Sequence, residues 1–120
     1  MVRPHSERWV GCRPAARLFK PAGIPASTLR VTGIDVDELE AMRLVDGEGM
    51  QQAEAAEQMR ISRSSVGRLL ESGRRKIARA LVEGEGIEIQ DGTAPINYRT
   101  QARRMAGRGG GRRRGMRGGE

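Results

Sequence analysis

The sequence predicts a mainly α fold, a three-helix helix-turn-helix domain with two short flanking strands and disordered basic ends. Three observations carry this prediction. Residues 52–71 have the apolar spacing of two helices packed across a tight turn, a helix-capping signal begins at Asp35, and both ends of the chain are basic and poor in core-forming residues. A chain of 120 residues has room for one compact domain and its tails.

The sequence divides into an arm, a domain and a tail. Residues 1–18 are expected to form an irregular basic arm, because prolines recur there, and Phe19 is its best apolar anchor. Residues 19–92 are expected to form the domain, with the motif at 52–71. Residues 93–120 are a linker and an Arg/Gly-rich tail that cannot bury enough apolar surface to offset its ordering entropy. The tail is therefore predicted to be disordered, and either holds nucleic acid loosely or only aids solubility.

The first elements of the domain are a short strand and a helix. Residues 29–32 alternate apolar and polar side chains, as a strand does. Asp35 and Glu38 have the spacing of a capping box, in which each side chain accepts from the backbone N–H of the other. The helix that follows ends near Asp46 and Gly47. Its acidic side is read as a solvated face that could also repel phosphate.

Residues 52–71 predict two helices joined at residues 60–62. Ser62 is placed to accept a hydrogen bond from the first turn of the second helix, and Ala56 is small where the helices cross. Arg60 occupies a turn position where glycine is usual, because the backbone there often has positive φ, and a left-handed arginine would cost about 1 kcal/mol. The apolar positions between the helices are Ala55, Met59, Ile61, Val66 and Leu69.

The second helix of the motif is expected to continue to residue 81 or 82. Its core-facing stripe consists of Val66, Leu69, Leu70, Gly73, Ile77, Ala80 and Leu81. After two glycines, residues 87–90 form a second alternating segment, which could pair with residues 29–32 within one chain or between subunits.

The exposed side of this helix supplies the candidate site. Residues expected to read base edges of double-stranded DNA are Ser62, Arg63, Ser64, Gly67 and Arg68. Residues expected to bind phosphates are Arg74, Arg75, Lys76 and Arg79. The charge of these residues alone is equally typical of a solvated helix face. The helix-turn-helix motif independently predicts that this face of the second helix meets DNA, and the agreement favours DNA binding.

Composition narrows the class of function. The net charge of +7 is concentrated in the motif and at both ends, which suits a polyanionic partner. One cysteine and one histidine provide neither a metal-ligand set nor an activated nucleophile, so we expect no enzyme, metal or cofactor. No signal peptide, transmembrane segment or amphipathic membrane-binding helix is visible, so a cytoplasmic, nucleoid-associated protein with no membrane partner is expected.

Four stretches resemble a family of small prokaryotic proteins, uncharacterised protein family 0251, which are regarded as DNA-binding. They are FKPAGIP (19–25), DELEAMRLVDGEGMQQAEAAEQM (37–59), ISRSSVGRLLESGRRKIARALVEG (61–84) and IEIQDG (87–92). The helices are also similar, more generally, to the promoter-reading region four of sigma factors. The resemblance implies a helix-turn-helix DNA-binder. Arg60 and the pair Ser65-Val66 depart from the family's Gly and Thr-Phe pattern.

Two functions follow from these observations. The first is a sequence-specific transcriptional regulator, expected as a homodimer because paired half-sites multiply affinity. The second is a protein-interaction adapter, for example on RNA polymerase, with only non-specific nucleic-acid affinity from its basic tail.

Overall fold

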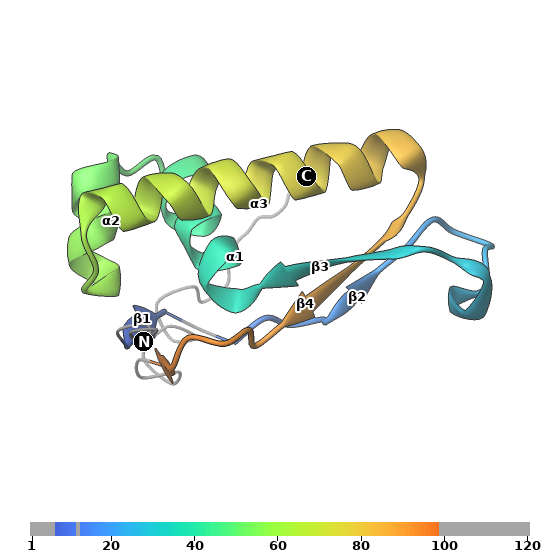
Figure 1. The fold of residues 1–120 in the computed structure, drawn as a ribbon, viewed down its shortest axis with the longest axis horizontal. Coiled ribbons are helices and arrows are strands. Elements are labelled where there is room, and N and C mark those ends of the chain that lie inside the picture. Colours follow the sequence, from blue (N-terminus) through green and yellow to red (C-terminus); the bar gives the residue numbers. More distant parts are fainter. Residues whose placement is uncertain (1–6, 12, 99–120) are drawn as a thin grey trace, which may run out of the picture.

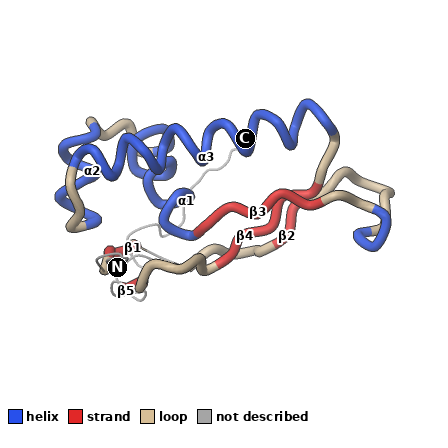
Figure 2. Tube along the Cα trace, viewed as in Figure 1, coloured by secondary structure: helices blue, strands red, loops and turns tan. Residues whose placement is uncertain are grey.

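The computed structural model describes residues 7–11 and 13–98 and contains a layer of helices over strands (Figures 1 and 2). In chain order the elements are β1 (Arg8–Val10), β2 (Leu18–Phe19), a short 3₁₀ turn (Ala26–Thr28), β3 (Val31–Asp35), α1 (Val36–Met42), a π-helical turn (Arg43–Gly47), α2 (Gln52–Met59), α3 (Arg63–Glu83), β4 (Gly86–Gln90) and β5 (Ile96–Tyr98). The three predicted helices are confirmed.

The described residues contain five strands rather than the two that the sequence predicts, and these strands form two small sheets. In the larger one β4 is central, with β3 parallel on one side and β2 antiparallel on the other. Ile34 of β3 lies opposite Ile89 of β4, so the two predicted segments pair within one chain. The first segment was expected at residues 29–32 and is observed at 31–35. The smaller sheet joins β1 to β5 in parallel.

The main core lies between the helices. Its buried side chains are Ala41, Leu44, Ala55, Ala56, Met59, Val66 and Leu70. A second cluster, of Val10, Val36 and Ile89, joins the first helix to both sheets. The expected core stripe of α3 is wrong at Leu81, which is 71% exposed because the last turn of the helix extends beyond the other helices.

The expectation of an irregular arm anchored by Phe19 is also wrong. Phe19 is half-exposed on the two-residue strand β2, whereas Val10 of β1 is almost fully buried. The arm is held by β1, which pairs with β5, and β5 lies beyond the expected domain end at residue 92. His5, Cys12 and the predicted disordered tail at 103–120 lie outside the described residues.

The acidic side of α1 is buried, so its interpretation as a solvated face is wrong. Asp37 forms an ion pair with Arg8 of β1 at 3.0 Å, and the side chain of each is only 8% exposed. Glu40 accepts from the backbone N–H of Gly11 at 2.9 Å and from the guanidinium of Arg43. A buried carboxylate needs such partners. Because two of these partners, Arg8 and Gly11, lie in the arm, the contacts attach the arm to α1.

Glu38 connects α1 to α3. Its carboxylate accepts from the Ser72 hydroxyl at 2.6 Å and from the Lys76 ammonium at 3.0 Å. It also accepts the backbone N–H of Asp35, and the predicted capping box is confirmed. Burial, together with the carboxylates of Glu38 and Asp37, raises the pKa of Asp35. Glu38 at the start of α1 thus caps that helix and also binds α3.

The turn between α2 and α3 has the predicted backbone conformation. Arg60 has φ 58° and ψ 43°, the left-handed region, and Ser62 accepts the backbone N–H of Ser65 at 3.1 Å. The structure adds a contact that the sequence did not indicate. The Arg60 guanidinium lies 3.9 Å from the centre of the Trp9 ring, so the side chain joins the turn to β1 through a cation–π contact.

This contact changes the effect expected for Arg60→Gly. From the sequence we expect the substitution to be nearly neutral or stabilising, since strain of about 1 kcal/mol is relieved. Loss of an exposed cation–π contact, about 0.5–1 kcal/mol, and the greater freedom of glycine in the unfolded chain oppose that gain. With this contact included, we expect Arg60→Gly to lower the free energy of unfolding by about 0.5 kcal/mol in the native protein. The same substitution should be neutral when Trp9 is replaced by leucine, because the cation–π contact is then already absent.

Urea denaturation of the four proteins in this double-mutant cycle measures the coupling. Equal effects of Arg60→Gly in both backgrounds would show that the stacking contributes nothing.

Candidate nucleic-acid interface

Helix α2 fixes the N-terminal half of α3 at one end of the molecule (Figure 1). Ala55 and Met59 of α2 and Val66 of α3 are fully buried, and Ala56 is nearly so. Small or flexible side chains let the helices approach, and the left-handed turn at Arg60 redirects the chain between them. The N-terminal half of α3 therefore keeps its outer side exposed.

The predicted base-reading residues lie together at the start of α3. Arg63, Ser64 and Arg68 are exposed, and Gly67 is half-buried. The Ser62 hydroxyl is engaged in the cap and lies 3.1 Å from the Ser64 hydroxyl. Ser62 therefore shapes the helix start, while the two arginines carry the longest exposed side chains of this group.

Gly67 is not required by the packing of the chain itself. A Cβ atom built there would meet only the Gln52 Oε1 atom, at 3.5 Å, which is an ordinary contact. By contrast, a Cβ atom on Gly73 would lie 2.8 Å from Met42 Cε, where α1 crosses α3. The two glycines of α3 thus differ, because a side chain would come too close to a neighbour within the fold at Gly73 but not at Gly67.

The predicted phosphate-binding residues are less uniform than the sequence suggests. Lys76 is bound to the buried Glu38, so it serves the α1–α3 contact. Arg74 pairs with Asp46 at 2.8 Å. This hydrogen bond lowers the pKa of Asp46 and raises that of Arg74. Both side chains are about half-exposed, so the pair contributes little stability.

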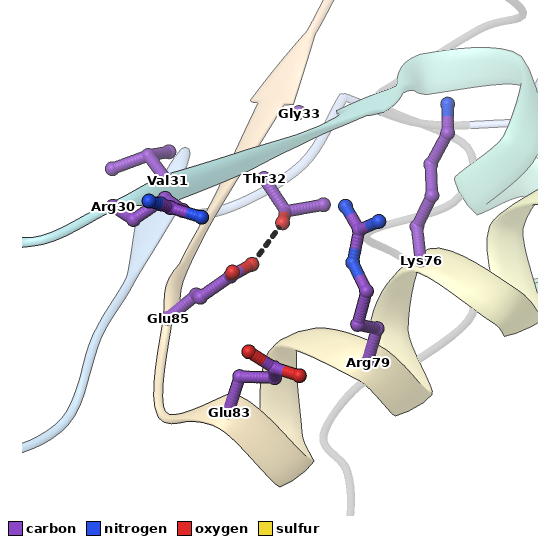
Figure 3. Close-up of a pocket in the computed structure, with 8 residues that line it drawn as sticks. All are labelled: Arg30, Val31, Thr32, Gly33, Lys76, Arg79, Glu83 and Glu85. Atoms are coloured by element: carbon purple, nitrogen blue, oxygen red, sulfur yellow. Dashed lines mark hydrogen bonds between the residues drawn. The ribbon is translucent and has the colours of Figure 1, made fainter.

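Arg75 and Arg79 differ in their surroundings. Arg75 makes an exposed pair with Glu71 at 3.1 Å, where both side chains are 71% exposed. Arg79 forms no ion pair within residues 7–11 and 13–98, and its guanidinium points toward Thr32 of β3 (Figure 3). Arg75 is thus the best-placed phosphate ligand of the four.

Sequence reasoning missed the residues that hold this surface in place. The carboxylates of Asp37, Glu38 and Glu40 contact partners that are far away in the chain, as between Glu38 and Ser72. A dense acidic run inside a basic protein is the signal that could have located them, although such a run alone is also typical of a solvated helix face. Over the described ranges no helix is long and apolar enough to cross a membrane.

Comparison with known proteins identifies the family. Residues 1–97 match the family model described as protein of unknown function DUF134. A UPF0251 protein of Caldanaerobacter subterraneus subsp. tengcongensis is 45% identical over 95% of this chain and 93% of its own length. A UPF0251 protein of Vibrio vulnificus is 46% identical over 74% of this chain and 89% of its own. No solved structure matches the chain. The chain therefore belongs to the DUF134 family, which includes these UPF0251 proteins, as the resemblance in its sequence implied.

Proposed function

We propose that the protein is a DNA-binding transcriptional regulator that reads the major groove with the start of α3. One observation carries the proposal. A left-handed turn and a serine cap place α3 against α2 so that Arg63, Ser64 and Arg68 are exposed at the helix start. This is the arrangement that a helix-turn-helix requires.

The dimensions and charges of α3 suit this role. An α-helix with its side chains is about 10–12 Å wide and fits a major groove about 12 Å wide. At 100° per residue, Ser64, Arg68 and Arg75 lie on one face, and all three are exposed. The free backbone N–H groups at the helix start favour a nearby phosphate. One face thus offers base-edge donors at its start and a phosphate ligand further along.

The rest of the domain supports α3 as a rigid element. Glu38 holds the middle of α3 through Ser72 and Lys76, and Asp46 contacts Arg74 from the π-helical turn. These contacts lie beside the proposed DNA face and leave Arg68 and Arg75 exposed. Such support matters because base readout depends on side chains held at fixed positions.

The proposal predicts that Gly67→Ala separates folding from DNA binding. Alanine should raise the free energy of unfolding by about 0.5–1 kcal/mol, since it is a better helix former and only the Gln52 side chain lies nearby. If Gly67 allows close approach of DNA, the same substitution should weaken binding to the preferred duplex. Thermal denaturation and fluorescence anisotropy measure the two effects.

Gly47→Ala is the matched control. No atom lies within 4 Å of a Cβ built at Gly47, and the residue is in the π-helical turn, outside the predicted base-reading residues. Its DNA affinity should stay unchanged. A Gly67→Ala protein that is more stable and binds every duplex as before would show that DNA does not approach this part of α3.

A further inference from the structure

Strand β3 has an unpaired edge. The order of the larger sheet is β2-β4-β3, so β3 pairs with another described strand on one side only. The backbone carbonyl of Arg30 accepts a hydrogen bond from the Gly86 N–H and so points toward β4, and backbone groups alternate in direction along a strand. The N–H and C=O groups of Val31 and Gly33 therefore point away from β4. The Val31 side chain is also 40% exposed, so it is accessible to a partner.

This edge borders an open groove of about 520 Å³ between β3 and the C-terminal half of α3 (Figure 3). Val31 and Gly33 line one side, and Lys76, Arg79 and Glu83 of α3 line the other. Glu85 accepts the Thr32 hydroxyl and so fixes the connection after α3 beside the strand. The groove thus exposes a strand edge with charged side chains of both signs next to it.

We propose that the β3 edge pairs with the β3 edge of a second copy of this chain. A twofold axis would run the two strands antiparallel and join two three-stranded sheets into one. Such an interface uses the same surface twice, so it must be self-complementary. The groove meets that condition, since cations at Arg30 and Arg79 can face carboxylates at Glu83 and Glu85 of the other copy. A strongly acidic or basic partner would instead meet like charges.

The spacing of the two α3 helices in such a dimer favours a second copy of this chain over an unrelated peptide at the β3 edge. This argument rests on the proposed function. Val66 lies near the middle of the reading segment, and Arg79 lies in the groove beside the axis. The helical rise of about 1.5 Å per residue separates them by about 20 Å along α3. In a dimer whose α3 helices run perpendicular to the axis, the reading segments then lie about 40 Å apart, close to the roughly 34–36 Å between successive major grooves.

Sedimentation equilibrium of the full chain tests the interface. The native protein should be a dimer, and Val31→Lys should weaken it at least tenfold, because a charge on an edge strand opposes strand pairing. Val31→Pro removes an N–H that does not serve β4 and should act in the same way. Val82→Lys is the control, since Val82 is 84% exposed on α3 and lies outside the groove. Circular dichroism checks that each variant folds.

Amide hydrogen exchange supplies a second readout. The N–H groups of Val31 and Gly33 should exchange slowly in the dimer and quickly after dilution to monomer. A monomeric native protein, a dimer that persists in both Val31 variants, or a dimer lost in Val82→Lys overturns the interface. A monomeric native protein that binds an extended peptide at this edge would assign the edge to another protein.

Failure of the interface and failure of the proposed function can be told apart. A native monomer that still prefers one duplex refutes only the interface. A native dimer without duplex preference refutes only the function. Monomeric Val31→Lys should keep its affinity for a duplex with one half-site, while losing at least tenfold on a duplex with two.

Discussion

Asp37→Ala is expected to lower the free energy of unfolding by about 3 kcal/mol, the largest effect of a single substitution that we predict. The substitution removes the carboxylate 3.0 Å from the Arg8 guanidinium, in a pair whose side chains are each 8% exposed. A buried charge deprived of such a partner costs about 3–5 kcal/mol. We take the lower value because Arg8 makes a further interaction. Urea denaturation followed by circular dichroism measures the change.

Two controls test whether the loss comes from the pair. Glu88→Ala removes an exposed carboxylate from β4 and should change stability by no more than about 0.5 kcal/mol. The double substitution Arg8→Met/Asp37→Leu replaces both charges with apolar side chains and should recover most of the loss. If Asp37→Ala were as mild as Glu88→Ala, the buried pair would not hold β1 to α1.

Arg63→Ala and Arg68→Ala are each expected to weaken binding to the preferred duplex by about 1–3 kcal/mol, or roughly 5- to 150-fold. Both side chains are exposed at the start of α3, where a helix in the major groove meets base edges. The loss should be concentrated on the preferred sequence, so the preference at the contacted base pairs should relax. Anisotropy titrations against the preferred duplex and single-base variants measure it.

Arg75→Ala is the matched comparison, because it removes the same kind of charge further along the same helix. It should weaken all duplexes alike and lower the slope of log affinity against log salt by about one unit. Equal, sequence-blind losses at Arg63, Arg68 and Arg75 would contradict the division of α3 into a reading part and a phosphate-binding part.

Local signals in the sequence were sufficient for much of the fold. The capping box at Asp35 and Glu38 and the serine cap of α3 involve residues only a few positions apart, and both are observed. The left-handed conformation of Arg60 followed from the geometry of a tight turn. Such features depend on neighbours that are fixed by the chain itself, so the residue types and their spacing were enough.

Long-range contacts were not predicted, for a physical reason. The residue type alone does not tell whether a carboxylate such as Asp37 or Glu38 is solvated or buried. Burial is favourable only where a partner pairs with the charge, so the position of the partner determines the outcome. Those partners, Arg8 and Lys76, lie far away in the sequence. The same holds for the pairing of β1 with β5, and for Lys76, which the sequence assigned to phosphate and the fold assigns to Glu38.

The most direct test of the proposed function is the ratio of affinities for a preferred duplex and for random duplex DNA. The preferred duplex is selected from a randomised pool with the full chain, and both affinities are measured between 50 and 200 mM salt. A regulator that reads the major groove through α3 should favour the selected duplex by about 10³-fold or more at physiological salt. Equal affinity for both, falling steeply with salt, would contradict major-groove reading and favour an adapter with only non-specific nucleic-acid affinity.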